Sequence, residues 1–383
     1  MSELNKRIEK VLKSRTERGL KRKLNDNLDR RQFNVDFSSN DYLSLAKNEK
    51  LIGIVKERLA KSDVMGSGGS RLLDGDTILH RQIERKLSNF YNGEDALLFN
   101  SGYDANVSIF ATIPDKDDIV IYDELIHASV HDGMRGSRTT HCWSFRHSDL
   151  NHLSELLNVA RKQHSGSIFI AVEAVYSMDG DLCPLEEIAN LTKGDINTHL
   201  VVDEAHSTGH IGSNGRGLVS ALNLDQYVAI KLNTFGKALC AAGAVVLCAP
   251  NVRNYLINYA RPLIFSTSMT LSNLHIVDVV HDYLSDGHLT TEIDNLKRNA
   301  TYLRQRLGIP ENVTPIVPIL TPQSKRLAKA LQDNGILVRP ITWPTVPKDK
   351  DRVRVCVHSH NTIEEIDKMV EIIEKFCTIR SKL

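Results

Sequence analysis

The sequence lacks any apolar run long enough to cross a membrane. A spanning helix needs about twenty mainly apolar residues, and no stretch of this chain approaches even about eighteen without interruption. The first residues are rich in polar and charged side chains and lack the apolar core of a secretory signal. We therefore expect neither a membrane-spanning segment nor an export signal.

An excess of charge of either sign is also missing. Lysine and arginine together number 48, aspartate and glutamate 47, and the formal net charge is +1. A nucleic-acid surface or an anionic membrane surface would favour a clear excess of basic residues. The charge balance therefore argues against nucleic acid and membrane as partners.

The six cysteines form no C-x-x-C pair and no combination with histidine at the spacing of a metal site. Most of them lie inside apolar runs, where a free thiol behaves as a small apolar side chain. The sequence thus predicts reduced, buried thiols and no bound metal.

What the sequence has in quantity is an alternation of apolar runs with helical patterns. The 383 residues are 41% hydrophobic and 25% charged, which is typical of a globular protein with two or three packed regions. Such alternation predicts an α/β protein with a mainly parallel central sheet and helices on both of its faces. The runs that indicate strands lie within 96–99, 118–123, 167–172, 200–202, 228–230 and 242–248.

The pattern divides the chain into three predicted regions. Residues 1–40 begin with an amphipathic basic helix and form an N-terminal helical arm, and residues 41–270 hold the alternating pattern of a large α/β domain. From residue 271 onward long helical patterns precede short strands, which indicates a smaller C-terminal α+β domain over 271–383.

An acid, a histidine and a lysine follow two of the predicted strands. Asp203 and His206 come directly after one strand, and Lys237 comes after the next. Ligands of open α/β sheets bind where such strands end. Pyridoxal phosphate (PLP) needs a lysine amine for a Schiff base and a carboxylate beside its ring nitrogen, and Lys237 and Asp203 suit these roles. A lone lysine or aspartate is more often a surface or turn residue, so the prediction depends on further motifs.

Two short segments resemble motifs of nucleotide-binding proteins. Asp203-Glu204-Ala205-His206 spells the box of a helicase family, and Gly236-Lys237 resembles the end of a P-loop. A P-loop needs glycine five residues before the Gly-Lys pair and serine or threonine after it, whereas this chain has Lys231 and Ala238 there. These departures, together with the near-neutral charge, argue against a nucleotide-driven helicase.

Other strand ends carry polar residues as well. Ser101 and Gly102 stand between a predicted strand and a helix, where free backbone N–H groups bind phosphate. His127 follows another strand and is either a structural histidine or a ring that covers the face of a planar cofactor. Arg352 and Arg354 share one face of an alternating strand, which is either a solvated face or a carboxylate-binding site.

Together these motifs resemble those of the α-oxoamine synthases, fold-type I PLP enzymes that join an amino acid to an acyl-CoA with loss of carbon dioxide. The resemblance runs from Gly19 to beyond His358 and implies an aspartate aminotransferase-like fold. The motifs that carry it are Ser39-Asn40-Asp41-Tyr42-Leu43, Gly66 to Gly75, Ser101-Gly102-Tyr103, His127-Ala128-Ser129, Tyr176 to Asp181, Asp203 to Gly209, Thr234-Phe235-Gly236-Lys237 and Arg352-Val353-Arg354.

The resemblance implies roles for the residues around the cofactor. Lys237 would hold PLP and remove the α-proton of the amino acid, Asp203 would pair with the ring nitrogen, and His127 would stack on the ring. His206 and Ser177 would contact the ring oxygen. The residues that would bind or frame the phosphate are Ser101, Gly102, Tyr103 and Thr234, together with Ser266 or Thr267 from a second subunit.

It also implies three substrate-binding residues. Arg354 would bind the carboxylate of the amino acid, and Asn40 would position the condensing intermediates. Arg22 would meet a carboxylate at the far end of the acyl chain, although Lys21 and Lys23 are equally basic neighbours.

Within the family the likeness is greatest to members that condense L-alanine with pimeloyl-CoA in biotin biosynthesis. It implies L-alanine and an acyl-CoA as substrates and a homodimer with shared active sites. Two alternatives stay open: a synthase that uses glycine or serine with a different acyl-CoA, and a non-catalytic partner subunit of the same fold. The segments that carry this likeness are Ser39-Asn40-Asp41, Thr234-Phe235-Gly236-Lys237, Gly243-Ala244 and Ser266-Thr267-Ser268-Met269.

One segment departs from the family pattern. Cys240-Ala241-Ala242 stands where the family usually carries a glycine after the lysine, which predicts a stiffer and bulkier loop. The departure leaves the width of the substrate open and does not affect the Schiff base.

The last three residues, Ser381-Lys382-Leu383, match the tripeptide that directs proteins into peroxisomes. In a eukaryotic source this motif predicts a peroxisomal enzyme, and in any other source we expect a cytoplasmic one.

Overall fold

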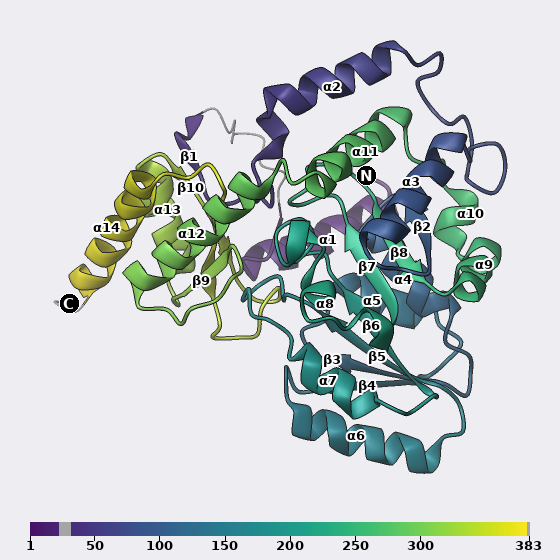
Figure 1. The fold of residues 1–383 in the computed structure, drawn as a ribbon. Helices are drawn as coiled ribbons and strands as arrows, with labels where there is room; N and C mark the ends of the chain where they lie inside the picture. The colour runs from purple at the N-terminus through teal and green to yellow at the C-terminus, as the bar shows by residue number, and fades with distance from the viewer. Residues whose placement is uncertain (23–31, 381–383) are drawn as a thin grey trace.

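The computed structural model describes residues 1–22 and 32–380. Its centre is a seven-stranded sheet in the order β2-β8-β7-β6-β5-β3-β4, shown in Figure 1. Neighbouring strands are parallel from β7 through β6, β5 and β3 to β4, and β8 runs antiparallel to both β7 and β2. The strands are β2 (Asp95–Phe99), β3 (Ile119–Asp123), β4 (His141–Phe145), β5 (Ile168–Glu173), β6 (Thr198–Asp203), β7 (Val228–Thr234) and β8 (Ala244–Cys248).

Continuous apolar runs form these strands because both faces of the sheet are covered. In β6, Leu200 and Val202 pack into one buried cluster while Val201 packs into another on the opposite face. One face is covered by α4 (Gly102–Thr112), α5 (Ala128–Arg135), α9 (Pro250–Tyr259) and α10 (Arg261–Phe265). The other is covered by α2 (Glu49–Ala60), α3 (Ile78–Phe90), α6 (Leu150–Gln163), α7 (Leu185–Thr192), α8 (Leu218–Ala221) and α11 (Leu271–Ser285). The predicted fold class is confirmed.

The C-terminal part has its own core beside this sheet (Figure 1). A three-stranded antiparallel sheet in the order β11-β12-β9 packs against three helices. The strands are β9 (Ile316–Leu320), β11 (Arg339–Ile341) and β12 (Arg352–Cys356), and the helices are α12 (Thr290–Leu307), α13 (Ser324–Asp333) and α14 (Ile363–Arg380). Short 3-10 helices lie at η2 (Leu45–Lys47), η3 (Ser213–Gly215) and η4 (Asp225–Tyr227).

The packing differs from the predicted division of the chain at two points. Helix α11 begins at the predicted boundary, residue 271. It buries Leu274 and Val277 in one cluster with Ile83 of α3, so it packs with the large sheet and not with the C-terminal part. Before residue 40, β1 (Val35–Asp36) pairs in parallel with β10 (Ile336–Leu337), so the end of the predicted arm belongs to the C-terminal part. At both points, contacts between residues that are far apart in the sequence determine to which part of the fold a segment belongs.

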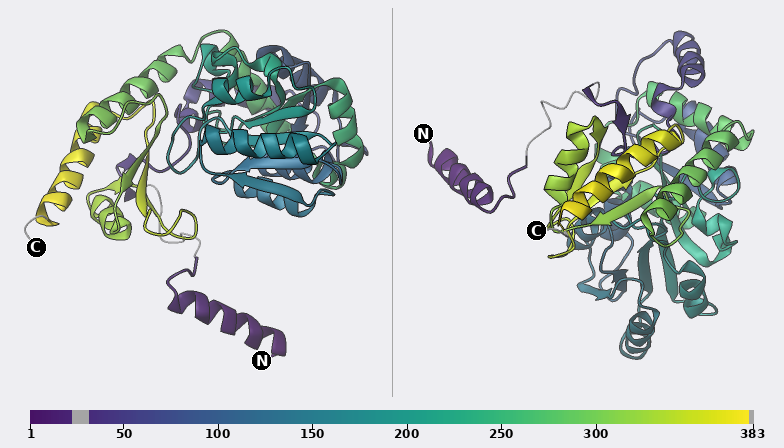
Figure 2. Two further views of the ribbon diagram at one scale, coloured as in Figure 1. Left: turned by 90° about the horizontal axis from the view of Figure 1, so that it is seen from below. Right: turned by 90° about the vertical axis from the view of Figure 1, so that its left-hand side faces the viewer.

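Helix α1 (Glu3–Glu17) projects away from the remainder of the protein in both views of Figure 2. It begins at Ser2, whose side chain accepts the N–H of Asn5, and none of its residues is buried. Its apolar stripe, with Leu4, Ile8 and Val11, is therefore exposed. In the described part of the chain no helix is long and apolar enough to cross a membrane.

Candidate active site

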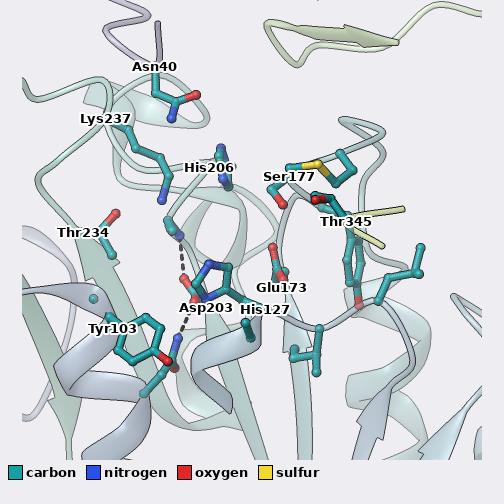
Figure 3. Close-up of a pocket in the computed structure, with 18 of the residues that line it drawn as sticks. Asn40, Tyr103, His127, Glu173, Ser177, Asp203, His206, Thr234, Lys237 and Thr345 are labelled. Atoms are coloured by element: carbon teal, nitrogen blue, oxygen red, sulfur yellow. Dashed lines mark hydrogen bonds between the residues drawn. The ribbon is translucent and has the colours of Figure 1, made fainter. Parts of the chain in front are cut away.

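The parallel strands end at one edge of the large sheet, and a cavity of about 1070 Å³ opens there (Figure 3). Glu173, Asp203 and Thr234 are the last residues of β5, β6 and β7, and all three line this cavity. Lys237 lines it as well, and its amine points toward Asp203 and His127 in Figure 3. The topology thus brings together the acid and the lysine that the sequence predicts.

Lys237 presents an amine suited to nucleophilic and base chemistry. Removal from water lowers the pKa of this amine below its usual range, and the charge of Arg354 acts in the same direction. Asp203 and Glu173 oppose the shift without cancelling it. Within the described residues the amine makes no hydrogen bond, so it is available to a ligand in the cavity.

Asp203 is held by N–H donors that fix its carboxylate. Its Oδ1 accepts the backbone N–H of Ala205 at 2.9 Å, and its Oδ2 accepts the side-chain amide of Asn106 at 2.8 Å. Asn106 in turn donates to the hydroxyl of Ser129 at 3.0 Å. The carboxylate is therefore oriented before any ligand arrives, as a partner for a ring nitrogen requires.

His127 begins helix α5, and its ring orientation is fixed locally. Nδ1 accepts the backbone N–H of Ser129 at 3.2 Å and lies 2.7 Å from the hydroxyl of the same residue. Burial lowers the pKa of His127, with the charge of Lys237 adding to the effect and that of Asp203 opposing it. A neutral, fixed ring beside Lys237 and Asp203 suits stacking on a planar cofactor.

His206 is buried beneath the same cavity and joins it to the N-terminal motif. Its Nδ1 lies 2.8 Å from the hydroxyl of Tyr42, which also donates to Oδ1 of Asn40 at 3.2 Å. Burial lowers the pKa of His206 well below its usual range, and the charges of Lys237 and Arg354 add to this shift. His206 and Asn40 are thereby connected through Tyr42, a residue to which the sequence assigned no role.

Three residues that share the cavity with Lys237 form a cradle for an anion. Ser101 begins helix α4 by accepting the N–H of Asp104 at 3.0 Å, and Gly102 occupies the first helical position. A Cβ atom on Gly102 would lie 2.5 Å from Cγ2 of Thr234, so only glycine fits. The Thr234 hydroxyl is buried and has no hydrogen-bond partner among the described residues. A free hydroxyl beside a helix N-terminus suits a phosphate group, and together with Lys237 and Asp203 these residues fit PLP.

Three further predicted cofactor residues differ in their placement. Tyr103 lines the cavity edge-on to His127, with 6.2 Å between ring centroids, and its hydroxyl bonds to Asp132. Ser266 and Thr267 are exposed and lie outside the cavity of their own chain, because Thr267 pairs with Ser70 instead.

Arg354 lies in the cavity with its guanidinium largely occupied by protein contacts. Nε donates to the carbonyl of Ser177 at 2.7 Å, Nη1 to Asn40 at 3.1 Å and to the thiol of Cys356 at 3.0 Å, and Nη2 to Tyr42 at 3.4 Å. Since a guanidinium has five N–H donors, one on Nη2 is left without a partner in the described chain. That group is available to a carboxylate in the cavity.

The alternative of a solvated face for β12 is wrong. Arg352 and Arg354 are 3% and 8% exposed, because the loop that carries Ser177 covers this side of the strand. Arg352 bonds to Asp179 on that loop. It fixes the segment around Ser177, which lines the cavity.

Arg22, predicted for the far end of the acyl chain, also lines the cavity and is exposed. Its neighbour Lys21 is described and does not line the cavity, and Lys23 lies outside the described residues. The segment after Lys237 forms part of the wall through Ala241 and Ala242, while Cys240 adopts a left-handed backbone with φ 52°.

Sequence reasoning missed two parts of the site. Glu173 is 3% exposed, and its Oε1 has no hydrogen-bond partner among the described residues. An acid that ends a buried apolar strand was a signal that could have identified it. Residues 343–348, between β11 and β12, also line the cavity. No local motif indicates that this loop reaches a cavity formed some hundred residues earlier in the chain.

Comparisons with known proteins agree with this geometry. Residues 34–373 match the family model of the class I and II aminotransferases. Over 367 residues the chain is 39% identical to 8-amino-7-oxononanoate synthase of Emericella nidulans, with 88% of each protein covered. It is 37% identical to the aminoacyl transferase sphA of Aspergillus fumigatus, covering 89% of this chain and 80% of the relative. A serine palmitoyltransferase variant from S. paucimobilis with bound PLP and myriocin superposes with a TM-score of 0.83 at 27% identity, covering 91% of this chain and 88% of that one.

Proposed function

Because the chain belongs to the α-oxoamine synthases, PLP-dependent acyltransferases within the class I and II aminotransferase family, we propose that it condenses L-alanine with pimeloyl-CoA. The products are 8-amino-7-oxononanoate, free CoA and carbon dioxide, and the reaction belongs to biotin biosynthesis. One observation carries the proposal: two arginines, Arg354 and Arg22, line the same cavity as Lys237. One suits the carboxylate of an amino acid and the other suits a carboxylate at the end of a diacid chain.

When bound, PLP supplies an electron sink that stabilises negative charge on the α-carbon of an amino acid. The chain's own residues hold it in place. Those that would do so are Asp203 at the ring nitrogen, His127 on the ring face, His206 and Ser177 at the ring oxygen, Ser101, Gly102 and Thr234 at the phosphate, and Lys237 at the aldehyde carbon.

Lys237 also moves a proton. A lowered pKa favours the neutral amine, so Nζ can accept the proton from the α-carbon of alanine and return one after carbon dioxide has left. Arg354 orients the same amino acid through its carboxylate, using the unpartnered N–H on Nη2. Ala241 and Ala242 contribute an apolar part of the cavity wall.

Relatives named aminoacyl transferase sphA and serine palmitoyltransferase favour a second candidate, a synthase that joins a different amino acid to a longer acyl-CoA. One assay separates the candidates. L-alanine, glycine and L-serine are each combined with pimeloyl-CoA and with palmitoyl-CoA, and the release of free thiol is followed. The proposal requires the fastest release with L-alanine and pimeloyl-CoA. Release only with palmitoyl-CoA favours the second candidate, and no release with any pair favours a non-catalytic partner subunit.

An exposed apolar surface near the cavity supports a homodimer. The loop over residues 65–75 and the segment after α10 are joined by the bridge between Ser70 and Thr267. Large apolar side chains on these segments are exposed, with Met65 at 93%, Leu73 at 76% and Phe265 at 70%. Burial against a second copy would remove this area from water and would let Ser266 and Thr267 reach the partner's phosphate site. Sedimentation that detects a stable, active monomer would contradict this proposal.

Import into peroxisomes is proposed on the C-terminal tripeptide alone, which lies outside the described residues. Peroxisomes shorten acyl-CoA chains and would provide thioesters of medium length. A fluorescent protein that carries the last residues of this chain should accumulate in peroxisomes of a eukaryotic cell, and a diffuse signal would contradict the proposal.

A further inference from the structure

An aromatic ring with two cations lies on the loop between β11 and β12. Trp343 and Lys348 both line the cavity that holds Lys237. Nζ of Lys348 lies 5.8 Å from the centroid of the Trp343 ring, and the guanidinium carbon of Arg18 lies 5.6 Å from it. A tryptophan face attracts cations through the negative potential of its π electrons. The ring therefore gathers positive charge at the wall of the cavity.

These cations lack acidic partners in the described part of the chain. None of the ion pairs there includes Arg18, Arg22 or Lys348, whereas the deeper Arg352 is paired with Asp179. Asp349 follows Lys348 without an ion pair, and the carboxylate of Asp351 accepts the backbone N–H of Trp343 at 3.4 Å. Arg22 and Lys348 line one cavity, and Arg18 lies against the same Trp343 ring as Lys348. Cations without a counter-charge attract an anion that binds beside them.

We propose that Trp343, Lys348 and Arg18 form a subsite for an anionic group of the acyl-CoA, distinct from the carboxylate site of Arg354. Trp343 positions the two cations, and they contact the anion. The anion is either the carboxylate at the far end of the acyl chain or a phosphate of CoA, since both present oxygens that accept hydrogen bonds from ammonium and guanidinium groups. The inference rests on the proposed function only in that the substrate is an acyl-CoA.

The location of the ring supports a role in acyl-CoA binding. Lys237 and Arg354 stand where the amino acid reacts, and Trp343 reaches the same cavity from the C-terminal part of the chain. The exposed Arg22 lines this cavity as well. An acyl-CoA that reacts beside Lys237 carries its CoA part away from the reacting centre, so other residues of the cavity wall are available to contact it. The loop over 343–348 forms one part of this wall.

The chain allows binding to be measured without catalysis. It contains two tryptophans, and Trp143 lies on β4, so a Trp143→Phe background leaves Trp343 as the sole tryptophan emitter. The PLP-loaded protein is titrated, without amino acid, with pimeloyl-CoA, with heptanoyl-CoA, which has the same chain length and no far carboxylate, and with free CoA. Dissociation constants are taken from calorimetry, and the emission of Trp343 shows whether the ligand reaches the ring.

Lys348→Met and Arg18→Met are compared in this background with Lys350→Met, which removes an exposed lysine that does not line the cavity. Each of the first two substitutions should raise the dissociation constant by about twofold to fivefold, as expected for an exposed charge pair. A rise confined to pimeloyl-CoA identifies the far carboxylate, and an equal rise for all three ligands identifies the phosphates.

Two results would overturn the inference: dissociation constants in Lys348→Met and Arg18→Met equal to those in Lys350→Met, or calorimetric binding that leaves the emission of Trp343 unchanged. Failure of the proposed function is distinguishable from both. In that case acyl-CoA binding would depend on Lys348 and Arg18, but L-alanine with pimeloyl-CoA would release no thiol.

Discussion

Glu173 and Asp203 are paired in register at the ends of β5 and β6, so their two carboxyl groups lie side by side in the wall of one cavity. Burial raises the pKa of Glu173 well above its usual range, and the charge of Asp203 adds to this effect. Asp203 accepts N–H bonds on both oxygens, whereas Oε1 of Glu173 accepts none from the described residues. Burial and the neighbouring acid therefore favour the protonated form of Glu173, whereas Asp203 presents both of its oxygens to N–H donors.

This relationship predicts that Glu173→Gln is tolerated and Asp203→Asn is not. Glutamine imitates the protonated acid, so the turnover of Glu173→Gln should stay within about threefold of the parent, whereas Asp203→Asn should lose roughly 10²–10³-fold because the ring nitrogen loses its charged partner. Steady-state rates of thiol release measure both. Equal losses in the two variants would show that Glu173 acts as an anion.

The same pair has a consequence for stability. A carboxyl whose pKa is raised in the folded state destabilises the fold as pH rises above its ordinary value, 4.5 for Glu173. Glu173→Gln should therefore unfold at a higher temperature than the parent near pH 7, and this gain should vanish below pH 4.5. A lower melting temperature of the variant at pH 7 would be inconsistent with a protonated Glu173.

Gly102→Ala should weaken the binding of PLP. The new methyl group would lie 2.5 Å from Cγ2 of Thr234, so the first turn of α4 must shift away from the cradle. We expect a rise of about tenfold or more in the dissociation constant of PLP, or about 1.4 kcal/mol, measured by the return of PLP absorbance to apoprotein. Thr234→Ser removes only the methyl group that causes the clash, so the double variant should regain most of the affinity. If the double variant did not regain affinity, the clash with Thr234 would not be the cause of the weaker binding of PLP.

Arg354→Lys should impair the use of L-alanine. A lysine cannot reproduce contacts to Ser177, Asn40 and Tyr42 while offering another donor to a carboxylate. Loss of a charged hydrogen bond predicts a fall of roughly 10-fold to 100-fold in kcat/KM for alanine. The KM for pimeloyl-CoA should change much less. If both substrates were affected equally, Arg354 would be supporting the fold of the site and not the amino acid alone.

His147 should stabilise the fold in a pH-dependent way. Its ring lies 2.9 Å from Asp123 and 2.8 Å from Asp181, and hydrogen bonds and charge from these two acids outweigh burial and raise the pKa of His147 to about 10. Because the folded-state pKa exceeds the ordinary 6.5, this stabilisation is fully present below pH 6.5 and is lost as pH rises toward 10. His147→Gln should cost about 1–3 kcal/mol at pH 6 and much less above pH 10, measured by urea unfolding. A cost independent of pH would contradict a charged His147.

Much of the site could be predicted because its residues follow strands that the sequence marks clearly. Asp203 ends the buried run of β6, and Lys237 follows that of β7, so parallel pairing alone brings the two to one edge of the sheet. His127 and Ser101 are found in the same way, since each begins a helix after a strand.

The remainder depends on contacts between distant parts of the chain. The alternation in β12 left open whether Arg352 is solvated, and the loop that covers it lies more than 170 residues earlier, with Arg352 and Met178 separated by 174 positions. The loop at 343–348 reaches the cavity only because the C-terminal part packs beside the large sheet. The sequence of helix α11 is that of an ordinary amphipathic helix. Only its packing against α3, which lies far away in the sequence, shows that it belongs with the large sheet.

The most direct test of the account is the visible absorbance of the purified protein with PLP, followed by thiol release on addition of L-alanine and pimeloyl-CoA. The account predicts an absorbance band of lysine-bound PLP that Lys237→Ala abolishes, and release of free CoA that depends on L-alanine and on Lys237. A protein that shows no such band, or one that releases the thiol equally well after Lys237→Ala, would contradict the central claim that Lys237 in this cavity carries the chemistry.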